Sequence, residues 1–230
     1  EVPGNVSSQF ITGLLLALPL LKADSEIVVT SSLESKSYID MTLSAMNRFG
    51  VTAIETENGY KVYGNQSYKP QHLNIEGDWS QAAFFLAAGA LGGNVSIENL
   101  DTASYQGDKA IYQLLRQFGA DITINGQVLS CKHNKLNGIE IDAENIPDLV
   151  PILAVVAALA EGTTTITGAA RLRIKESDRL HAITEGLNKL GADITELPDG
   201  LRINGVKSLN GGAVQGYNDH RIVMAFSVAT

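Results

Sequence analysis

Apolar residues recur along the chain in two alternating helical patterns. One is a run rich in small apolar residues, as in Ala82 to Leu91 and Val150 to Ala160, and it predicts a buried helix. The other is a one-sided apolar stripe in Tyr38 to Phe49, repeated in Lys109 to Phe118 and Leu180 to Leu190. The stripe predicts an amphipathic helix, and we interpret it as core packing rather than as a cofactor site.

The two patterns belong to a repeat of about 70 residues. Each amphipathic stretch ends at a glycine, Gly50, Gly119 or Gly191, and a β-branched run typical of a strand follows. Each small apolar run follows a Ser, Asn or Asp that can cap a helix. These helix starts are Ser7-Ser8-Gln9, Gly77-Asp78-Trp79-Ser80, Ile146-Pro147-Asp148 and Asn218-Asp219-His220. The repeat therefore predicts an α/β fold of β-α-β-α-β-β units, with the first helix of each unit buried.

The repeat period also predicts how the chain divides. A fourth unit begins at Asp219 and the sequence stops within its first helix, whereas Ser7 opens a helix with almost no strand before it. We therefore expect a fragment of a longer protein. The polar, proline-containing segment from Gly64 to His72 is the best domain boundary, and a surface loop between repeats is the alternative interpretation.

Composition excludes several classes of function. The chain has 230 residues, of which 44% are hydrophobic and 18% charged, as in globular proteins. Its net charge of -8 opposes nucleic-acid binding, which depends on clustered Lys and Arg. No apolar run is long enough to span a membrane, and no signal peptide is recognisable. The single cysteine, Cys131, indicates a reducing compartment and hence a cytoplasmic protein.

Repeats that pack side by side bring equivalent helix starts to the same side of the protein, where free N–H groups and helix dipoles attract anions. The third unit adds fixed charges where its second helix begins. Lys175 and Arg179 share a helix face if that helix starts by Lys175, and Glu176 beside them can donate or accept a proton. The alternative interpretation is a solvated, salt-bridged helix start.

The remaining helix starts allow two interpretations as well. His220 and Arg221 place positive charge at the positive N-terminal end of a helix, which is unfavourable. Either a bound anion or the capping residue Asp219 can offset this cost. Asp148 is most simply an acidic residue that stabilises the first turn of its helix. If a substrate hydroxyl lies within hydrogen-bond reach, Asp148 can instead act as a base. The sequence contains no zinc, Walker or dinucleotide-binding motif.

Five motifs together resemble the 5-enolpyruvylshikimate-3-phosphate synthase family. In chain order they are Ser7-Ser8-Gln9-Phe10, Ser35-Lys36-Ser37-Tyr38-Ile39-Asp40, Ile146-Pro147-Asp148, Arg173-Ile174-Lys175-Glu176-Ser177-Asp178-Arg179 and Tyr217-Asn218-Asp219-His220-Arg221. The resemblance implies the inside-out α/β barrel of enolpyruvyl transferases, in which two lobes each contain three such repeats. Residues 1–70 would be the last repeat of the first lobe, and residues 71–230 two repeats and the start of a third from the second lobe.

The resemblance also implies a reaction: transfer of the enolpyruvyl group of phosphoenolpyruvate to the 5-hydroxyl of shikimate 3-phosphate, releasing phosphate and using no metal or organic cofactor. Asp148 would accept the 5-hydroxyl proton, and Glu176 would take part in proton transfer at the phosphoenolpyruvate methylene carbon. Shikimate 3-phosphate would bind to Ser7, Ser8, Gln9, Ser35, Tyr38, Asp148 and Lys175. Phosphoenolpyruvate would bind to Gln9, Arg179, His220 and Arg221.

The resemblance is incomplete. Arg171 stands where some members of the family have an asparagine that contacts shikimate, so it receives no role. Family contacts from both missing ends are absent, and we therefore expect this chain alone to be inactive or nearly so and its parent to be a monomeric enzyme. Two alternatives remain: the related enolpyruvyl transferase for UDP-N-acetylglucosamine, and a noncatalytic anion-binding repeat module.

Overall fold

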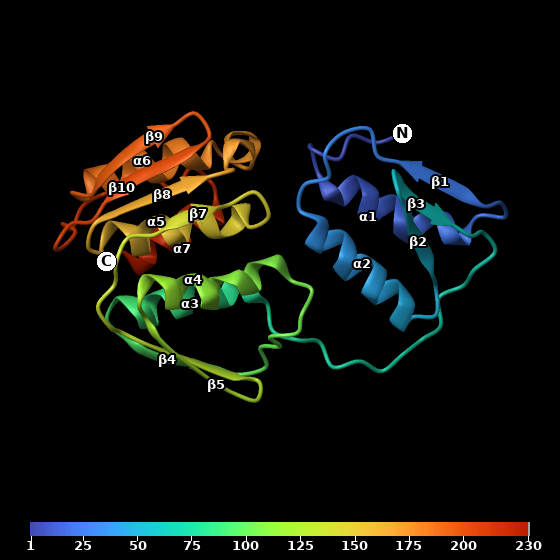
Figure 1. The fold of residues 1–230 in the computed structure, drawn as a ribbon, viewed down its shortest axis with the longest axis horizontal. Helices are drawn as coiled ribbons and strands as arrows, with labels where there is room; N and C mark the ends of the chain where they lie inside the picture. Colours follow the sequence, from blue (N-terminus) through green and yellow to red (C-terminus); the bar gives the residue numbers. More distant parts are fainter. Residues whose placement is uncertain (230) are drawn as a thin grey trace. The chain divides into compact units, whose positions relative to one another are not determined.

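The computed structural model describes residues 1–229, and the chain divides into two compact units (Figure 1). The N-terminal unit comprises Glu1–Ile75 with Tyr105–Gly107, and the C-terminal unit comprises Glu76–Ser104 and the chain from Asp108 onwards. Each unit has its own hydrophobic core.

The N-terminal unit pairs two helices with a small sheet. Its elements are α1 (Ser8–Ala17), the 3-10 turn η1 (Leu18–Leu20), β1 (Ser25–Val28), α2 (Lys36–Arg48), β2 (Ala53–Thr56) and β3 (Gly59–Val62). The antiparallel sheet has the order β1-β3-β2, with Ile27 opposite Tyr60 and Ala53 opposite Val62. Buried residues of α1, α2 and β3 form one core, so the stripe of Tyr38 to Phe49 is core packing as expected.

The C-terminal unit contains the remaining elements. The second repeat supplies α3 (Trp79–Leu91), β4 (Asn94–Ile97), η2 (Gly107–Lys109), α4 (Ala110–Phe118), β5 (Asp121–Asn125) and β6 (Val128–Lys132). The third supplies β7 (Glu140–Asp142), η3 (Pro147–Leu149), α5 (Val150–Ala158), β8 (Thr163–Thr167), η4 (Ala170–Ile174), α6 (Arg179–Lys189), β9 (Asp193–Leu197) and β10 (Gly200–Asn204). The fourth begins with α7 (His220–Val228).

Helices lie between two sheets in the C-terminal unit (Figure 1). One sheet has the order β4-β6-β5 and packs on α3; the other has the order β7-β8-β10-β9 and packs on α5 and α6. Helices α3, α5 and α7 contact one another between the sheets, and every residue of α5 is buried. This arrangement explains the apolar composition of α5, which has no face left for water, and of most of α3, where Gln81 and Phe85 remain exposed.

Among the repeats predicted from the sequence, only the third is complete within the described residues. The third repeat has all six elements, and its first strand β7 runs parallel to β8 with Ile141 opposite Ile166. In the first repeat the first strand is reduced to an isolated bridge between Val2 and Val29. In the second, the described structure has no strand between β3 and α3, so the β-α-β-α-β-β prediction is wrong there.

The chain before α3 is held by the N-terminal unit, which explains the missing strand. The Gln66 side chain accepts a hydrogen bond from Thr52 N (2.8 Å) and donates one to Thr52 O (2.9 Å). The hydroxyl of Tyr68 donates to Leu16 O at 2.8 Å. Residues tied down in this way cannot pair with β4. The predicted boundary segment Gly64 to His72 is thus attached along its first half rather than free.

Helix ends follow the sequence prediction. Gly50, Gly119 and Gly191 have φ values of 78°, 116° and 89°, the left-handed conformation that ends a helix without the penalty of a Cβ atom. At the opposite ends, the Asp78 side chain caps α3 by accepting from Ser80 N (2.8 Å), and the Asp219 side chain caps α7 by accepting from Arg221 N (3.0 Å).

Candidate functional site

Three helix starts converge in the C-terminal unit. Arg221, in the first turn of α7, donates from one terminal nitrogen to Ser80 Oγ in the first turn of α3 (2.6 Å). Its other terminal nitrogen lies 2.9 Å from a carboxylate oxygen of Asp148, which precedes α5 in η3. The prediction that repeated helix starts gather on one side is therefore confirmed for α3, α5 and α7, with their positive ends directed toward the same polar cluster.

Arg179 lies at the centre of this cluster and is 1% exposed. Its Nε lies 2.7 Å from Asp219, its Nη1 lies 2.9 Å from Asp148, and its Nη2 lies 2.7 Å from Glu176. Burying a guanidinium alone is very costly, so a set of hydrogen-bonded carboxylates is what such a position needs. The arrangement brings the two candidate acid–base residues, Asp148 and Glu176, onto the two terminal nitrogens of one side chain.

Asp219 anchors Arg179 and the start of α7 together. It is fully buried, accepts from Arg179, and also accepts from the Ser177 hydroxyl at 3.0 Å and from Arg221 N. Burial acts to raise the pKa of Asp219, but the hydrogen bond and charge of Arg179 outweigh burial and hold the pKa below its usual value. For Arg179, burial acts to lower the pKa and Asp219 raises it above its usual value. Both groups are therefore charged at neutral pH.

The loop that carries Lys175 and Glu176 is held in place by Arg173. This guanidinium bonds to Asp178 (3.1 Å) and Glu196 (2.6 Å) and donates to the Leu197 carbonyl at 2.7 Å, which ties the loop to the β9–β10 hairpin. Both Lys175 and Glu176 are exposed.

Helix α6 begins at Arg179, so the condition under which Lys175 and Arg179 would share a helix face, a start by Lys175, is not met. Asp178 is the cap, because its side chain accepts from His181 N at 3.1 Å, and Lys175 is extended with φ -84° and ψ -159°. Lys175 and Arg179 consequently do not share a helix face. The carboxylate of Asp178 sets the start of α6, because it satisfies a free N–H group of the first turn.

His220 differs from Arg221 in its surroundings. Its side chain is 56% exposed, and its Nδ1 lies 3.9 Å from Asp219. The two residues before the cap, Tyr217 and Asn218, both have φ 53°. A left-handed backbone at two consecutive non-glycine residues is strained, and such strain often accompanies functional sites. It directs the chain sharply into the start of α7.

The candidate residues of the N-terminal unit lie at two neighbouring helix starts: Ser7, Ser8 and Gln9 at α1, and Ser35 and Tyr38 at α2. Glu34 N donates to Gly4 O at 3.2 Å, and the hydroxyls of Thr12 and Thr42 are 3.0 Å apart, so the first halves of the helices lie side by side. Ser35 is buried with φ 54°, another left-handed non-glycine residue. The Ser7 side chain caps α1 by accepting from Gln9 N at 3.3 Å.

Two members of the polar cluster were missed by sequence reasoning. Ser80 was quoted only as part of a helix start, and it proves to be the hydrogen-bond acceptor of Arg221. Asp108 was not singled out; it is 5% exposed, and burial raises the pKa of its carboxyl to about 6. Asp108 directly precedes the apolar stripe of Lys109 to Phe118, and no local pattern in the sequence marks it as buried.

The other chemical features are limited. No group of His, Cys, Asp and Glu within residues 1–229 is arranged to hold a metal ion. None of the helices described is both long and apolar enough to cross a membrane. Cys131 is buried in β6, where burial raises the pKa of its thiol to about 11. Arg171 donates to the Glu144 carbonyl at 3.0 Å.

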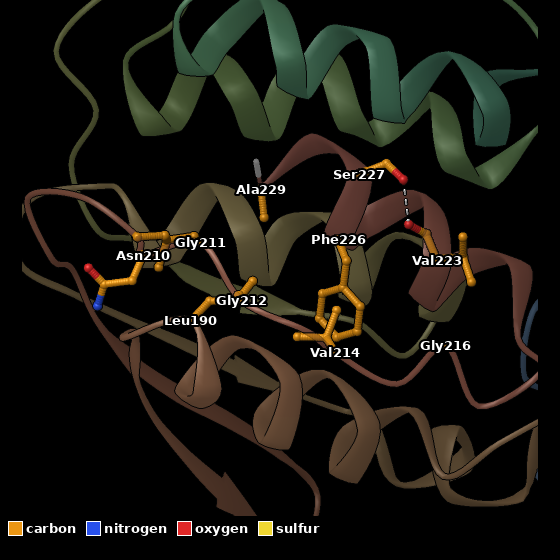
Figure 2. Close-up of a pocket in the computed structure, with 11 residues that line it drawn as sticks. Leu190, Asn210, Gly211, Gly212, Val214, Gly216, Val223, Phe226, Ser227 and Ala229 are labelled. Atoms are coloured by element: carbon orange, nitrogen blue, oxygen red, sulfur yellow. Dashed lines mark hydrogen bonds between the residues drawn. The ribbon is translucent and has the colours of Figure 1, made fainter.

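A well-formed apolar pocket of about 410 Å³ lies elsewhere in the C-terminal unit (Figure 2). Phe226 and Val223 of α7 line it together with Leu190 and the segment from Leu209 to Gly216, and no charged side chain is among its lining residues. The pocket thus offers no fixed positive charge to a phosphorylated anion. The polar cluster around Arg179 and Arg221 is therefore the stronger candidate for anion chemistry.

Comparisons with known proteins agree with the architecture. The model of the EPSP synthase (3-phosphoshikimate 1-carboxyvinyltransferase) family matches residues 1–230. A 3-phosphoshikimate 1-carboxyvinyltransferase of Clostridium perfringens is 54% identical over 234 residues, covering 100% of this chain and 55% of the relative. The chain thus spans about half the length of the curated relatives it matches.

Solved structures give the same result. The EPSP synthase of Acinetobacter baumannii superimposes with a TM-score of 0.80 at 30% identity, over 97% of this chain and 54% of that one. An enolpyruvyl transferase of Streptomyces tendae superimposes with a TM-score of 0.73 at 16% identity, over 96% of this chain and 52% of that one. The second likeness is one of fold alone.

Proposed function

The chain belongs to the EPSP synthase family, and on that premise we propose that it is part of an enzyme that transfers the enolpyruvyl group of phosphoenolpyruvate to the 5-hydroxyl of shikimate 3-phosphate, releasing phosphate. The observation that carries the proposal is the pairing of Asp148 and Glu176 on the guanidinium of Arg179. Two carboxylates fixed at separate points around one cation are suited to two separate proton transfers.

The two carboxylates have different surroundings and so receive different roles. Asp148 is largely buried, contacts both arginines, and is assigned to the proton of the 5-hydroxyl. Glu176 is half exposed on a loop and is assigned to proton transfer at the methylene carbon of phosphoenolpyruvate. Each positioned acid or base typically contributes about 10²–10⁴-fold to the rate.

Arg221, His220 and Arg179 are assigned to the phosphoenolpyruvate anion, with Gln9 as a further contact. Arg221 already bonds to the carboxylate of Asp148 through one terminal nitrogen, and a substrate carboxylate or phosphate is an anion that a guanidinium can bind with two parallel hydrogen bonds. Arg179 is 1% exposed, so it can contact a bound anion directly only if Glu176 or Asp148 moves aside. Otherwise its charge acts through the carboxylates that it orients.

Shikimate 3-phosphate is assigned to the two helix starts of the N-terminal unit, through Ser7, Ser8, Gln9, Ser35 and Tyr38, and to Asp148 and Lys175. Hydroxyl groups and backbone N–H groups at a helix start suit phosphate oxygens. The exposed ammonium of Lys175 adds a mobile positive charge. We assign the whole protein to the cytoplasm as a monomer that binds no nucleic acid or membrane, a proposal supported by the unpaired Cys131 and the net charge of -8.

Calorimetric titration of this chain with shikimate 3-phosphate tests the proposal, with shikimate as the phosphate-free control and with UDP-N-acetylglucosamine as the competing substrate. We expect binding that depends on the 3-phosphate and strengthens when phosphoenolpyruvate is present. Binding of the sugar nucleotide but not of shikimate 3-phosphate contradicts the proposal.

We expect turnover only from the full-length protein, because this chain spans about half the length of its relatives. In that protein, Glu176→Gln is expected to lower kcat by at least about 10²-fold while ligand binding persists. A Glu176→Gln variant with unchanged kcat removes Glu176 from the chemistry. A rate near that of the full-length enzyme from this chain alone contradicts the expectation that it is inactive.

A further inference from the structure

Glu185 is an acidic residue of α6 to which the proposed reaction gives no role. Both of its carboxylate oxygens are engaged. Oε1 pairs with the ammonium of Lys189, one helical turn further along α6, and Oε2 accepts a hydrogen bond from the hydroxyl of Tyr217. Tyr217 lies outside α6, in the segment directly before α7. The carboxylate therefore links the middle of α6 to the entry of the helix that carries Arg221.

The link reaches α7 at a tight turn. Asp219 N donates to Gly216 O at 2.9 Å, which closes a β-turn around Tyr217 and Asn218, and both of these residues have φ 53°. Positive φ at both central positions is the pattern of a type I′ turn, which Gly, Asn and Asp adopt most readily. Asn218 suits such a position, whereas the backbone preference of a bulky tyrosine disfavours it. The turn therefore needs support from outside itself, which the hydrogen bond from Tyr217 to Glu185 supplies.

The charges around Glu185 favour this hydrogen bond. The hydrogen bonds from Lys189 and then from Tyr217 lower the pKa of Glu185 below its usual value, so its carboxylate is ionised at neutral pH. The pKa of Tyr217 is raised above its usual value, first by the hydrogen bond to Glu185, so its hydroxyl keeps its hydrogen. A neutral donor on an ionised acceptor belongs to the stronger class of hydrogen bonds. His181 Nε2 lies 3.4 Å from the same carboxylate, where its protonated form also favours the anion.

Helix α6 consequently holds the start of α7 at two points. The first is the buried ion pair between Arg179, in the first turn of α6, and Asp219, at 2.7 Å. The second is the bond between Glu185 and Tyr217, about 9 Å further along α6 at a rise of about 1.5 Å per residue. One attachment lets a segment pivot, whereas two separated attachments fix the direction in which the chain enters α7.

We propose that Glu185 is a positioning residue: by accepting the hydrogen bond of the Tyr217 hydroxyl, it holds the turn before α7 and so sets the direction in which α7 presents Arg221. Arg221 depends on that direction because its two terminal nitrogens meet Ser80 at 2.6 Å and Asp148 at 2.9 Å. The consequence for substrate binding rests on the proposed function, in which Arg221 contacts phosphoenolpyruvate. The hydrogen bond and the turn belong to the unliganded protein.

Hydrogen exchange of the unliganded 230-residue chain tests whether the bond holds the turn. The reporter is the backbone amide of Asp219, whose hydrogen bond closes the turn, followed by NMR at one fixed pH. Tyr217→Phe keeps the ring and the backbone preference and removes only the hydroxyl. We expect this amide to exchange about tenfold faster in Tyr217→Phe, the lower end for a hydrogen bond to a charged group. Glu185→Leu should give the same increase and the double variant no more, because both changes remove one bond.

Two variants at the same carboxylate are the controls. Lys189→Gln removes the other partner of Glu185 and should leave the exchange of the Asp219 amide within about twofold of the wild type. Glu185→Gln keeps an amide oxygen that accepts from Tyr217, so it should recover most of the protection lost in Glu185→Leu. The proposal is overturned if Tyr217→Phe exchanges at the wild-type rate, or if the effects of Tyr217→Phe and Glu185→Leu add in the double variant.

Kinetics of the full-length protein separate this inference from the proposed function. If Arg221 binds phosphoenolpyruvate, Tyr217→Phe should raise the KM for phosphoenolpyruvate about tenfold and leave the KM for shikimate 3-phosphate unchanged, a split that a merely structural role does not produce. Faster exchange at Asp219 with no change in either KM supports the positioning of the turn and contradicts the assigned substrate contact. A raised KM for phosphoenolpyruvate without faster exchange overturns the positioning role and leaves the substrate contact standing. Folding of each variant is checked by the fluorescence of Trp79, which is buried in α3 of the same unit.

Discussion

Replacing Asp219 by asparagine removes the charge that pairs with Arg179 and keeps the helix cap. Asparagine and aspartate are about equally good N-caps, so Asp219→Asn leaves the start of α7 intact. Removing one partner of a buried ion pair costs about 3–5 kcal/mol. Asp148 and Glu176 remain on the guanidinium at 2.9 and 2.7 Å, so we expect a loss near the lower end, about 3 kcal/mol. Asp219→Ala should lose about 1 kcal/mol more, because it also removes the cap.

Urea unfolding at neutral pH measures this loss, since urea does not screen charges as guanidinium does. The chain has one tryptophan, Trp79, which is fully buried in the C-terminal unit and therefore reports on the unit that contains Asp219. Asp121→Asn, an exposed Asp in the same unit, is the matched control and should change the free energy of unfolding by less than about 0.5 kcal/mol. If Asp219→Asn behaves like this control, the reasoning about the buried pair is refuted.

The loss should also depend on pH in a definite direction. The pKa of Asp219 is lowered in the folded protein, so its contribution is present above the unfolded pKa and disappears as the pH falls through the folded pKa. The difference between the wild type and Asp219→Asn should therefore shrink on acidification. A difference that grows in acid contradicts the sign of the argument.

Three other predictions follow from burial. Asp108→Asn should be more stable than the wild type at pH 8 by up to about 3 kcal/mol and nearly equal to it below pH 4. The reason is that the folded pKa of Asp108 is raised from 3.8 to about 6, so the stability of the wild type falls as the pH rises through that window. Urea unfolding at both pH values measures the difference. Gly186→Ala should destabilise the folded protein by about 1–3 kcal/mol, because the added Cβ would lie 2.0 Å from Phe226 Cζ. Gly13→Ala should stabilise α1 by about 1 kcal/mol, because its added Cβ meets nothing within 4 Å. Thermal unfolding followed by circular dichroism measures both changes. The Cys131 thiol should resist alkylation at pH 8 until urea unfolds the chain, as judged by mass spectrometry; labelling of the native protein would contradict its burial.

Sequence patterns were most informative where local rules and packing agree. Helix starts and ends were predictable because a cap and a left-handed glycine are decided within a few residues, as Asp78 and Gly119 show. The meeting of α3, α5 and α7 followed from the repeat period, since equivalent elements of stacked units lie alike. The same reasoning predicted that the helix starts carrying Asp148 and Arg221 lie on one side of the protein, where the two side chains are 2.9 Å apart.

Features that depend on distant partners were not predictable. Asp108 joined the cluster because η2 is carried to the start of α3, which no local pattern reveals. The missing first strand of the second repeat reflects hydrogen bonds from Gln66 and Tyr68 to the N-terminal unit. The sequence left open whether α6 starts by Lys175, and the hydrogen bond from His181 N identifies Asp178 as the cap.

The hydrogen bond between Ser80 and Arg221 joins residues 141 positions apart in the chain. Closing so long a loop is entropically unfavourable until the segments between them have folded, and contacts of high sequence separation form late. The second and third repeats must therefore fold and dock before Arg221 can find its acceptor. Docking of α7 in this sense completes the cluster, and a chain interrupted before α7 contains the helices of the second and third repeats but lacks the arginine that bonds to Ser80.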